Sequence, residues 1–126
     1  MTSHFALIEH GIAFSDEGTT KADLFRGTGL FAGLNCFEIG QSQAVHIHGG
    51  ADKFYFVVSG KARMTVGEET ADAEAGTLVW APAGVPHGVV RALERTVMLV
   101  AMGPPPGSGI ALKDSLPVAG GREGGK

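Results

Sequence analysis

The chain has 126 residues, of which 44% are hydrophobic and 18% are charged, so its composition is that of one ordinary globular domain. The formal net charge is −3 and the basic residues are scattered, which argues against a nucleic-acid partner. No apolar run is long enough to span a membrane, and the N-terminus does not have the pattern of a secretory signal. Because Cys36 is the single cysteine, the chain forms no internal disulfide, and we expect a cytoplasmic protein.

Short strand-like segments, separated by glycine-rich or charged turns, follow one another along most of the chain. Weak strand signals come first, at Ala6–Glu9 and Ala22–Phe25. Stronger strand segments follow at Leu34–Ile39, Ala44–His48, Phe54–Val58, Ala62–Val66, Thr77–Ala81, Gly88–Leu93 and Thr96–Ala101. No segment reads as a convincing helix. Many short strands at this spacing predict an all-β fold, either an antiparallel sandwich or a barrel.

The segment "FYFVV", Phe54–Val58, is apolar at every position. A strand with one face in water alternates between apolar and polar residues, so we expect this strand to be covered on both faces. The barrel interior supplies one cover. A second sheet, a second subunit or the chain's own N-terminal arm all fit as the other.

Composition divides the chain into three regions. Residues 1–33 are predicted to form an N-terminal arm and leading strands, and residues 34–102 the β-barrel. Residues 103–126 hold four of the six prolines and many glycines. They predict an extended C-terminal arm that ends in a flexible tail.

Three of the five histidines occur in a pattern that suggests a metal site. Residues two apart in a strand face the same side, so His46 and His48 can bring two imidazoles to one ion. His87 follows the loop "PAGVP", in which two prolines and a glycine favour a rigid turn. Taken singly, each segment also fits an ordinary strand or hairpin with surface histidines.

Together these two segments resemble the two signature motifs of the cupin superfamily. The first motif is glycine, five residues, His-x-His, three or four residues, glutamate, six residues and glycine. This chain fills it with Gly40, His46, His48, Lys53 in place of the glutamate, and Gly60. The second is glycine, five residues, Pro-x-Gly, two residues, histidine, three residues and asparagine. Here it is filled by Gly76, Pro82, Gly84, His87, and Arg91 in place of the asparagine.

The resemblance implies a jelly-roll barrel, or double-stranded β-helix, that holds a divalent metal through three histidines and one glutamate. His46, His48 and His87 match the histidines, but a protonated Lys53 supplies no lone pair and repels a cation. Asp52 is the nearest carboxylate, and it can replace the glutamate only if a turn or bulge re-aims it, since neighbours in a strand face opposite sides.

Three states of the site fit these residues. In the first, the three histidines alone hold Zn, Fe, Ni or Mn, with positions open to water or substrate. In the second, Asp52 completes the ligand set. In the third, the pocket holds an organic molecule without metal, and Lys53 pairs with an anion.

Further pocket residues are suggested by their alternation along the strands. Tyr55 shares the face of Lys53, and Arg91 shares the face of His87, so both join Lys53 as predicted substrate-pocket residues. Arg91 either faces a substrate carboxylate or pairs with Glu94 or Glu74 at the rim. Trp80, Met64 and Cys36 are predicted to be ordinary core residues.

Two classes of function fit this resemblance. One is a metal-dependent enzyme, dioxygenase- or isomerase-like, that acts on a small organic substrate. The other is a non-enzymatic module that binds a small ligand, with or without metal. Relatives of this fold commonly form homodimers, so a homodimer is expected, whereas nucleic-acid and membrane partners are not.

Overall fold

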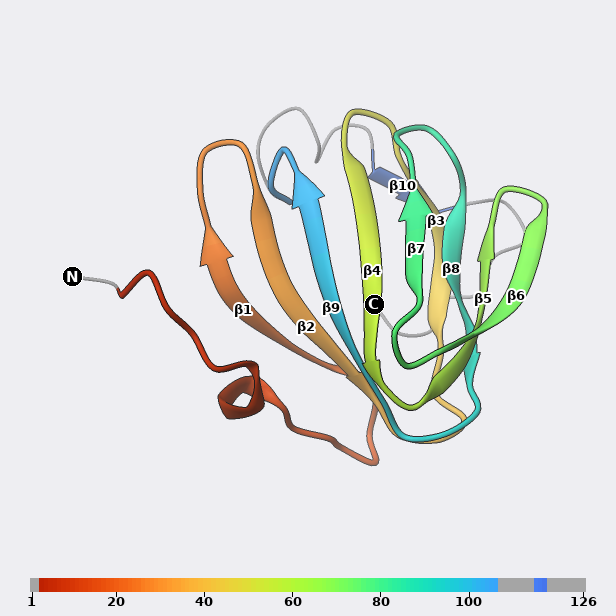
Figure 1. Cartoon of the computed structure of the whole chain (residues 1–126). Helices are drawn as coiled ribbons and strands as arrows, with labels where there is room; N and C mark the ends of the chain where they lie inside the picture. The colour runs from red at the N-terminus through yellow and green to blue at the C-terminus, as the bar shows by residue number, and fades with distance from the viewer. Residues whose placement is uncertain (1–2, 107–114, 118–126) are drawn as a thin grey trace.

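Two five-stranded antiparallel sheets make up the fold in the computed structural model, which describes residues 3–106 and 115–117 (Figure 1). The first sheet contains, in spatial order, β1 (Thr20–Arg26), β2 (Phe31–Phe37), β9 (Thr96–Gly103), β4 (Asp52–Ser59) and β7 (Leu78–Ala81). The second contains β10 (Ser115–Pro117), β3 (Gln43–His48), β8 (His87–Ala92), β5 (Lys61–Val66) and β6 (Glu69–Glu74). A 3₁₀ helix, η1 (Ile8–Gly11), precedes them. The predicted all-β jelly roll is confirmed.

Most of the predicted strands are present, with ends shifted by a few residues. The Ala6–Glu9 strand is wrong, because η1 begins at Ile8 and no strand forms there. Strand β6 was not predicted, because its sequence "ETADAE" is polar and nearly all exposed at a sheet edge. Strand β10 was also not predicted; it pairs with β3. Residues 107–114 and 118–126 of the predicted C-terminal arm and tail lie outside the described residues.

Alternation along β4 separates the interior of the barrel from its outer surface. Tyr55 and Val57 are fully buried in the core between the sheets, where Met98 of β9 and Val89 of β8 also lie. The side chains of Phe54, Phe56 and Val58 point the other way and are only partly buried. One face of β4 is therefore covered as predicted, whereas its other face is covered only in part.

The N-terminal segment covers one region of the outer surface of the first sheet. Ile8, Ile12 and Phe14 pack against a small cluster that contains Leu34 and the buried thiol of Cys36. Val58 belongs to the same cluster, so the chain's own arm supplies its second cover. Burial of Cys36 in apolar surroundings agrees with the core role predicted for it.

The outer face of β4 and β7 is left uncovered by the described residues. Trp80 of β7 lies opposite Phe54, and Leu78 lies opposite Phe56. Trp80 is 56% exposed and Leu78 is 63% exposed. The prediction that Trp80 is a core residue is therefore wrong, because its position in β7 points it away from the barrel interior. Met64, by contrast, is buried in the core.

Helices contribute little to this fold. No helix in the described ranges has both the length and the apolar character needed to cross a lipid bilayer.

The motif glycines have backbone conformations that other residues rarely adopt. Gly40, Gly60, Gly76 and Gly84 have positive φ angles of 89°, 89°, 92° and 80°. A Cβ atom disfavours this left-handed region, so glycine is the default residue there. At Gly60 space is restricted as well, because an added Cβ would overlap the carbonyl oxygen of Arg95 and lie 2.7 Å from the Cα of Thr96.

Substitution of Gly60 by alanine is expected to destabilise the fold strongly. Gly60→Ala combines an unfavourable φ with a backbone clash and should lower the free energy of unfolding by roughly 3 kcal/mol. Gly40→Ala is the matched control, since it has the same φ but nothing within 4 Å of the added Cβ. It should cost about 1 kcal/mol. Urea unfolding of both variants measures the difference, and equal losses would contradict this account.

Candidate metal centre

Three histidines from two neighbouring strands of the second sheet form one cluster. His46 and His48 lie at the end of β3, and His87 begins β8 directly opposite His46. One ligand nitrogen from each ring lies within 4.8 Å of the other two. The ring centroids of His46 are 4.6 Å from His48 and 4.7 Å from His87. The predicted trio is therefore brought together.

The close approach of β3 and β8 depends on the residue after His87. A Cβ atom on Gly88 would lie 2.9 Å from both the carbonyl oxygen of Gln43 and the Cα of Val45. Any larger residue would push the two strands apart and separate His46 from His87. Gly88 is a supporting residue that the motif comparison did not identify. Only the strand register reveals its place.

Hydrogen bonds from three directions hold the loop that leads to His87. The side chain of Asp52 accepts a hydrogen bond from the backbone N–H of Ala83 at 2.9 Å. The carbonyl of His48 accepts one from Gly84 at 3.0 Å, and the carbonyl of Pro86 accepts one from Gly67 at 2.8 Å. The expectation of a fixed loop before His87 agrees with these contacts.

Asp52 and Lys53 point to opposite faces of β4, as alternation requires. Asp52 is exposed, and it is not among the residues that could share an ion with the histidines. Neither a turn nor a bulge re-aims it, so the structure does not bring it to the cluster. Lys53 instead faces the interior and is only 6% exposed. The residue in the place of the family's glutamate is thus the one that points inward.

Backbone contacts orient two of the imidazoles for metal binding. Nδ1 of His46 lies 2.8 Å from the carbonyl oxygen of Ala44, and Nδ1 of His87 lies 3.0 Å from that of Val85. A carbonyl only accepts, so each Nδ1 carries the proton and each Nε2 carries a lone pair. Nε2 of His87 is buried, and no described residue forms a hydrogen bond with it. A metal ion is the partner that this atom fits, since such contacts are typical of metal-ligating histidines.

The spacing of the cluster is slightly wider than a bound ion requires. Nitrogens that share one tetrahedral ion at about 2.1 Å lie about 3.4 Å apart. Side-chain rotations that bring the rings together by an ångström or so supply the difference. No fourth protein ligand joins the cluster among the described residues, so a bound ion would keep positions open toward the cavity.

Burial keeps two of the histidines neutral. It lowers the pKa of His48 to about 3, assisted by the positive charge of Lys53. Burial also lowers the pKa of His87 to about 4, although the contact with the Val85 carbonyl opposes that shift. A neutral imidazole is the form that binds a metal ion, so His48 and His87 are both in that form over the neutral range.

Lys53 lies above an aromatic ring that is itself fixed in the core. Its Nζ is 4.8 Å from the ring centroid of Tyr55, a cation–π contact. The hydroxyl of Tyr55 donates a hydrogen bond to Oε1 of Gln43 at 2.9 Å, and burial raises the pKa of that hydroxyl. Burial lowers the pKa of Lys53 to about 7, and the nearby charge of Lys21 adds to this shift. Tyr55 is a support beneath Lys53 and does not line the cavity.

Arg91 lies away from the site because of a bulge in β8. Arg91 pairs with Arg63 of β5, whereas Val89 pairs with Met64, so Val90 is an extra residue between them. The bulge reverses the alternation, and Arg91 is exposed instead of facing inward with His87. The structure does not place it in the cavity, and no ion pair joins it to Glu74 or Glu94 within the described residues.

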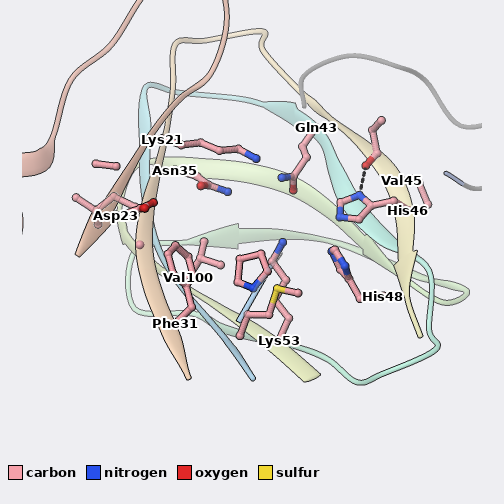
Figure 2. A pocket seen from close by; sticks show the side chains of 16 residues that line it. Lys21, Asp23, Phe31, Asn35, Gln43, Val45, His46, His48, Lys53 and Val100 are labelled. Carbon is pink, nitrogen blue, oxygen red and sulfur yellow. Dashed lines mark hydrogen bonds between the residues drawn. The ribbon is translucent and has the colours of Figure 1, made fainter. Parts of the chain in front are cut away.

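A cavity of about 460 Å³ is lined in part by His46 and His48. Figure 2 shows the polar side chains that line it, which are Lys21, Asp23, Asn35, Gln43, His46, His48 and Lys53. Apolar walls come from Phe31, Val45, Val100 and Met102. The motifs did not identify Lys21, Asn35 and Gln43. Lys21 and Asn35 lie directly opposite each other on β1 and β2, a pairing that only the register reveals.

The neutral histidines make the metal-free protein sensitive to acid. The pKa of His87 is about 4 in the folded chain and about 6.5 when exposed, so the unfolded chain binds the extra proton between these values. Stability should therefore fall as the pH falls from about 6.5 to about 4. Urea unfolding at several pH values measures this slope. His87→Gln should show a shallower slope, and His10→Gln, at an exposed residue of η1, should keep it; an unchanged slope in His87→Gln would contradict the assignment.

Comparison with known proteins agrees with this fold. Residues 33–103 match the Cupin domain family. SCO3923, an uncharacterized protein of Streptomyces coelicolor, is 38% identical over 80 residues, which cover 64% of this chain and 75% of that protein. The crystal structure of TT1209 from Thermus thermophilus is 32% identical, with a TM-score of 0.77, and the match covers 82% of this chain and 100% of that one. An RmlC-like cupin from Desulfovibrio desulfuricans is 27% identical, with a TM-score of 0.69 and coverage of 83% and 98%. The chain belongs to the cupin superfamily.

Proposed function

We propose that this protein is a small metal-binding cupin in which His46, His48 and His87 hold one divalent transition metal, Zn, Fe, Ni or Mn. The single observation that carries the proposal is the buried Nε2 of His87, with which no described residue forms a hydrogen bond. It belongs to a trio of histidines whose ligand nitrogens all lie within 4.8 Å of one another. A buried lone pair without a donor is unfavourable, and a metal ion satisfies it.

We further propose that the site is that of a metal-dependent enzyme, dioxygenase- or isomerase-like, acting on a small organic molecule. A bound ion would supply Lewis-acid chemistry at positions that face the cavity. The chain's own residues bind and orient the molecule: Lys53 and Gln43 provide polar contacts, and Phe31 and Met102 belong to the apolar wall that excludes water.

A non-enzymatic binding module is the second candidate, and the position of Lys53 favours it. An inward-facing lysine where the family has a glutamate removes an anionic ligand and offers a contact for a bound molecule. Turnover separates the two candidates. The metal-loaded protein should convert at least one of a set of small carbonyl and phenolic compounds if it is an enzyme, whereas a binding module would bind one of them unchanged.

Metal content provides the direct test of the histidine site. Untagged protein supplied with Zn²⁺, Fe²⁺, Ni²⁺ or Mn²⁺ and then dialysed should retain close to one equivalent of at least one metal, measured by elemental analysis. His46→Ala and His87→Ala should each lower the affinity by at least about tenfold, because a shared ion loses one of three ligands. His10→Ala should retain the metal. Full retention in both cluster variants would refute the site.

We also propose a homodimer that forms through the outer face of β4 and β7. Phe54, Phe56, Leu78 and Trp80 form a continuous apolar strip there, and none of them is charged. Burying this strip against a second copy would remove two large exposed side chains from water. Strand β7 is also an edge strand, so its free backbone groups are available for pairing with another chain.

A charged residue in this strip should separate the subunits. Trp80→Glu places a carboxylate in the centre of the proposed interface, and the variant should be monomeric at concentrations where the unmodified protein is dimeric. Light scattering coupled to size-exclusion chromatography measures the mass. Val90→Glu is the matched control, because Val90 is 47% exposed but lies on the other sheet. A monomeric unmodified protein would contradict the proposed dimer.

A further inference from the structure

The charged side chains that line the cavity are mostly positive. Lys21 and Lys53 are both part of its wall, and Asp23 is the one carboxylate among the described lining residues. The three histidines add no negative charge, and a divalent ion held by them would add two positive charges. The space next to the histidines therefore has a positive potential that an anionic ligand would balance.

Lys53 is buried without a counter-ion among the residues that the structure describes. It is 6% exposed, and its Nζ contacts the ring of Tyr55. The ion pairs found within residues 3–106 lie elsewhere, between Arg63 and Asp72 and between Arg95 and Glu38. Burying an ammonium group in this way is costly, and a buried charge that the protein itself does not compensate points to a ligand that does.

Gln43 supplies a second donor to the cavity, and like Lys53 it contacts Tyr55. Its side-chain oxygen is occupied by the hydroxyl of Tyr55 at 2.9 Å. The other half of the amide, the Nε2 group, has no such bond within the described part of the chain, and Gln43 lines the cavity (Figure 2). In this orientation of the amide, the group that remains for a ligand is a donor of two hydrogens.

We propose that the ligand of this cavity is a small carboxylic acid, whose carboxylate accepts hydrogen bonds from Nζ of Lys53 and Nε2 of Gln43. The remainder of the molecule extends along the apolar wall that includes Phe31, Val100 and Met102. A second oxygen next to the carboxylate, such as a hydroxyl, lies on the side of His46 and His48. The inference rests on the proposed metal site only in placing this second oxygen near the histidines that would hold the ion.

The cavity has the size that such a molecule needs. Its volume of about 460 Å³ falls within the range of roughly 300–1,000 Å³ typical of small-molecule sites. Charge-assisted hydrogen bonds are stronger than those between neutral groups, so the carboxylate should bind more tightly than the matching amide by roughly tenfold or more.

A matched pair of probes tests the charge preference. Mandelate carries a carboxylate, an adjacent hydroxyl and an apolar ring, and mandelamide has the same shape without the charge. Calorimetric titration at about pH 6 keeps Lys53 protonated, since its pKa is lowered only to about 7, and keeps mandelate ionised. The unmodified protein, both metal-free and zinc-loaded, should bind mandelate roughly tenfold or more tightly than mandelamide.

Variants locate the preference in the two proposed contacts. Lys53→Met and Gln43→Glu should each abolish the preference for mandelate; Gln43→Glu keeps an acceptor for Tyr55 but places a negative charge in the cavity. Arg91→Met should retain the preference, because it removes an exposed cation outside the cavity. Circular dichroism confirms that each variant is folded.

The outcomes separate this inference from the proposed metal site. Equal affinity for the two probes, no detectable binding of mandelate, or a preference that survives both Lys53→Met and Gln43→Glu would overturn the carboxylate proposal even if zinc is retained. A preference that persists in metal-free protein unable to hold zinc would support the carboxylate contact while contradicting the metal site.

Discussion

The antiparallel pairing of β3 with β8 is the contact on which the rest of the site depends. It places His46 opposite His87, and alternation then brings His48 to the same side. Gly88 allows the two backbones to approach, because an added Cβ would lie 2.9 Å from the carbonyl oxygen of Gln43. The pairing links His46 and His48 to His87, about forty residues further along the chain, so the metal centre exists only in the folded protein.

Burial has opposite consequences for the histidines and for the lysine of the cavity. For His48 and His87 it favours the neutral ring, which is the form that offers a lone pair to an ion. For Lys53 it disfavours the charged form, and Lys21 adds to the cost. The same burial therefore keeps two ligands neutral for a cation and leaves one cation in need of an anion. A metal and a carboxylate together would satisfy both.

Lys53 occupies the motif position of the family's glutamate, and the neighbouring carboxylate of Asp52 has a different role. Lys53 takes the inward position, where it lies over Tyr55. The carboxylate of Asp52 is turned outward, yet it still serves the site, because it holds Ala83 in the loop that precedes His87. A carboxylate near the metal motif thus acts through the backbone and not through the ion.

Local patterns in the sequence determined much of this protein. The strand periods predicted an all-β sandwich or barrel, because alternation and turn conformation are set by neighbours along the chain. The motif glycines and the spacing of His46, His48 and His87 predicted the jelly roll and the trio of imidazoles through their resemblance to the cupin motifs. Only the tertiary structure decided the side-chain directions and cross-strand neighbours that depend on strand register and bulges. An extra residue at Val90 turned Arg91 outward, strand pairing placed Lys21 beside Asn35, and β7 directed Trp80 to the surface. Those outcomes arise from hydrogen bonds between distant strands, and no local pattern records them.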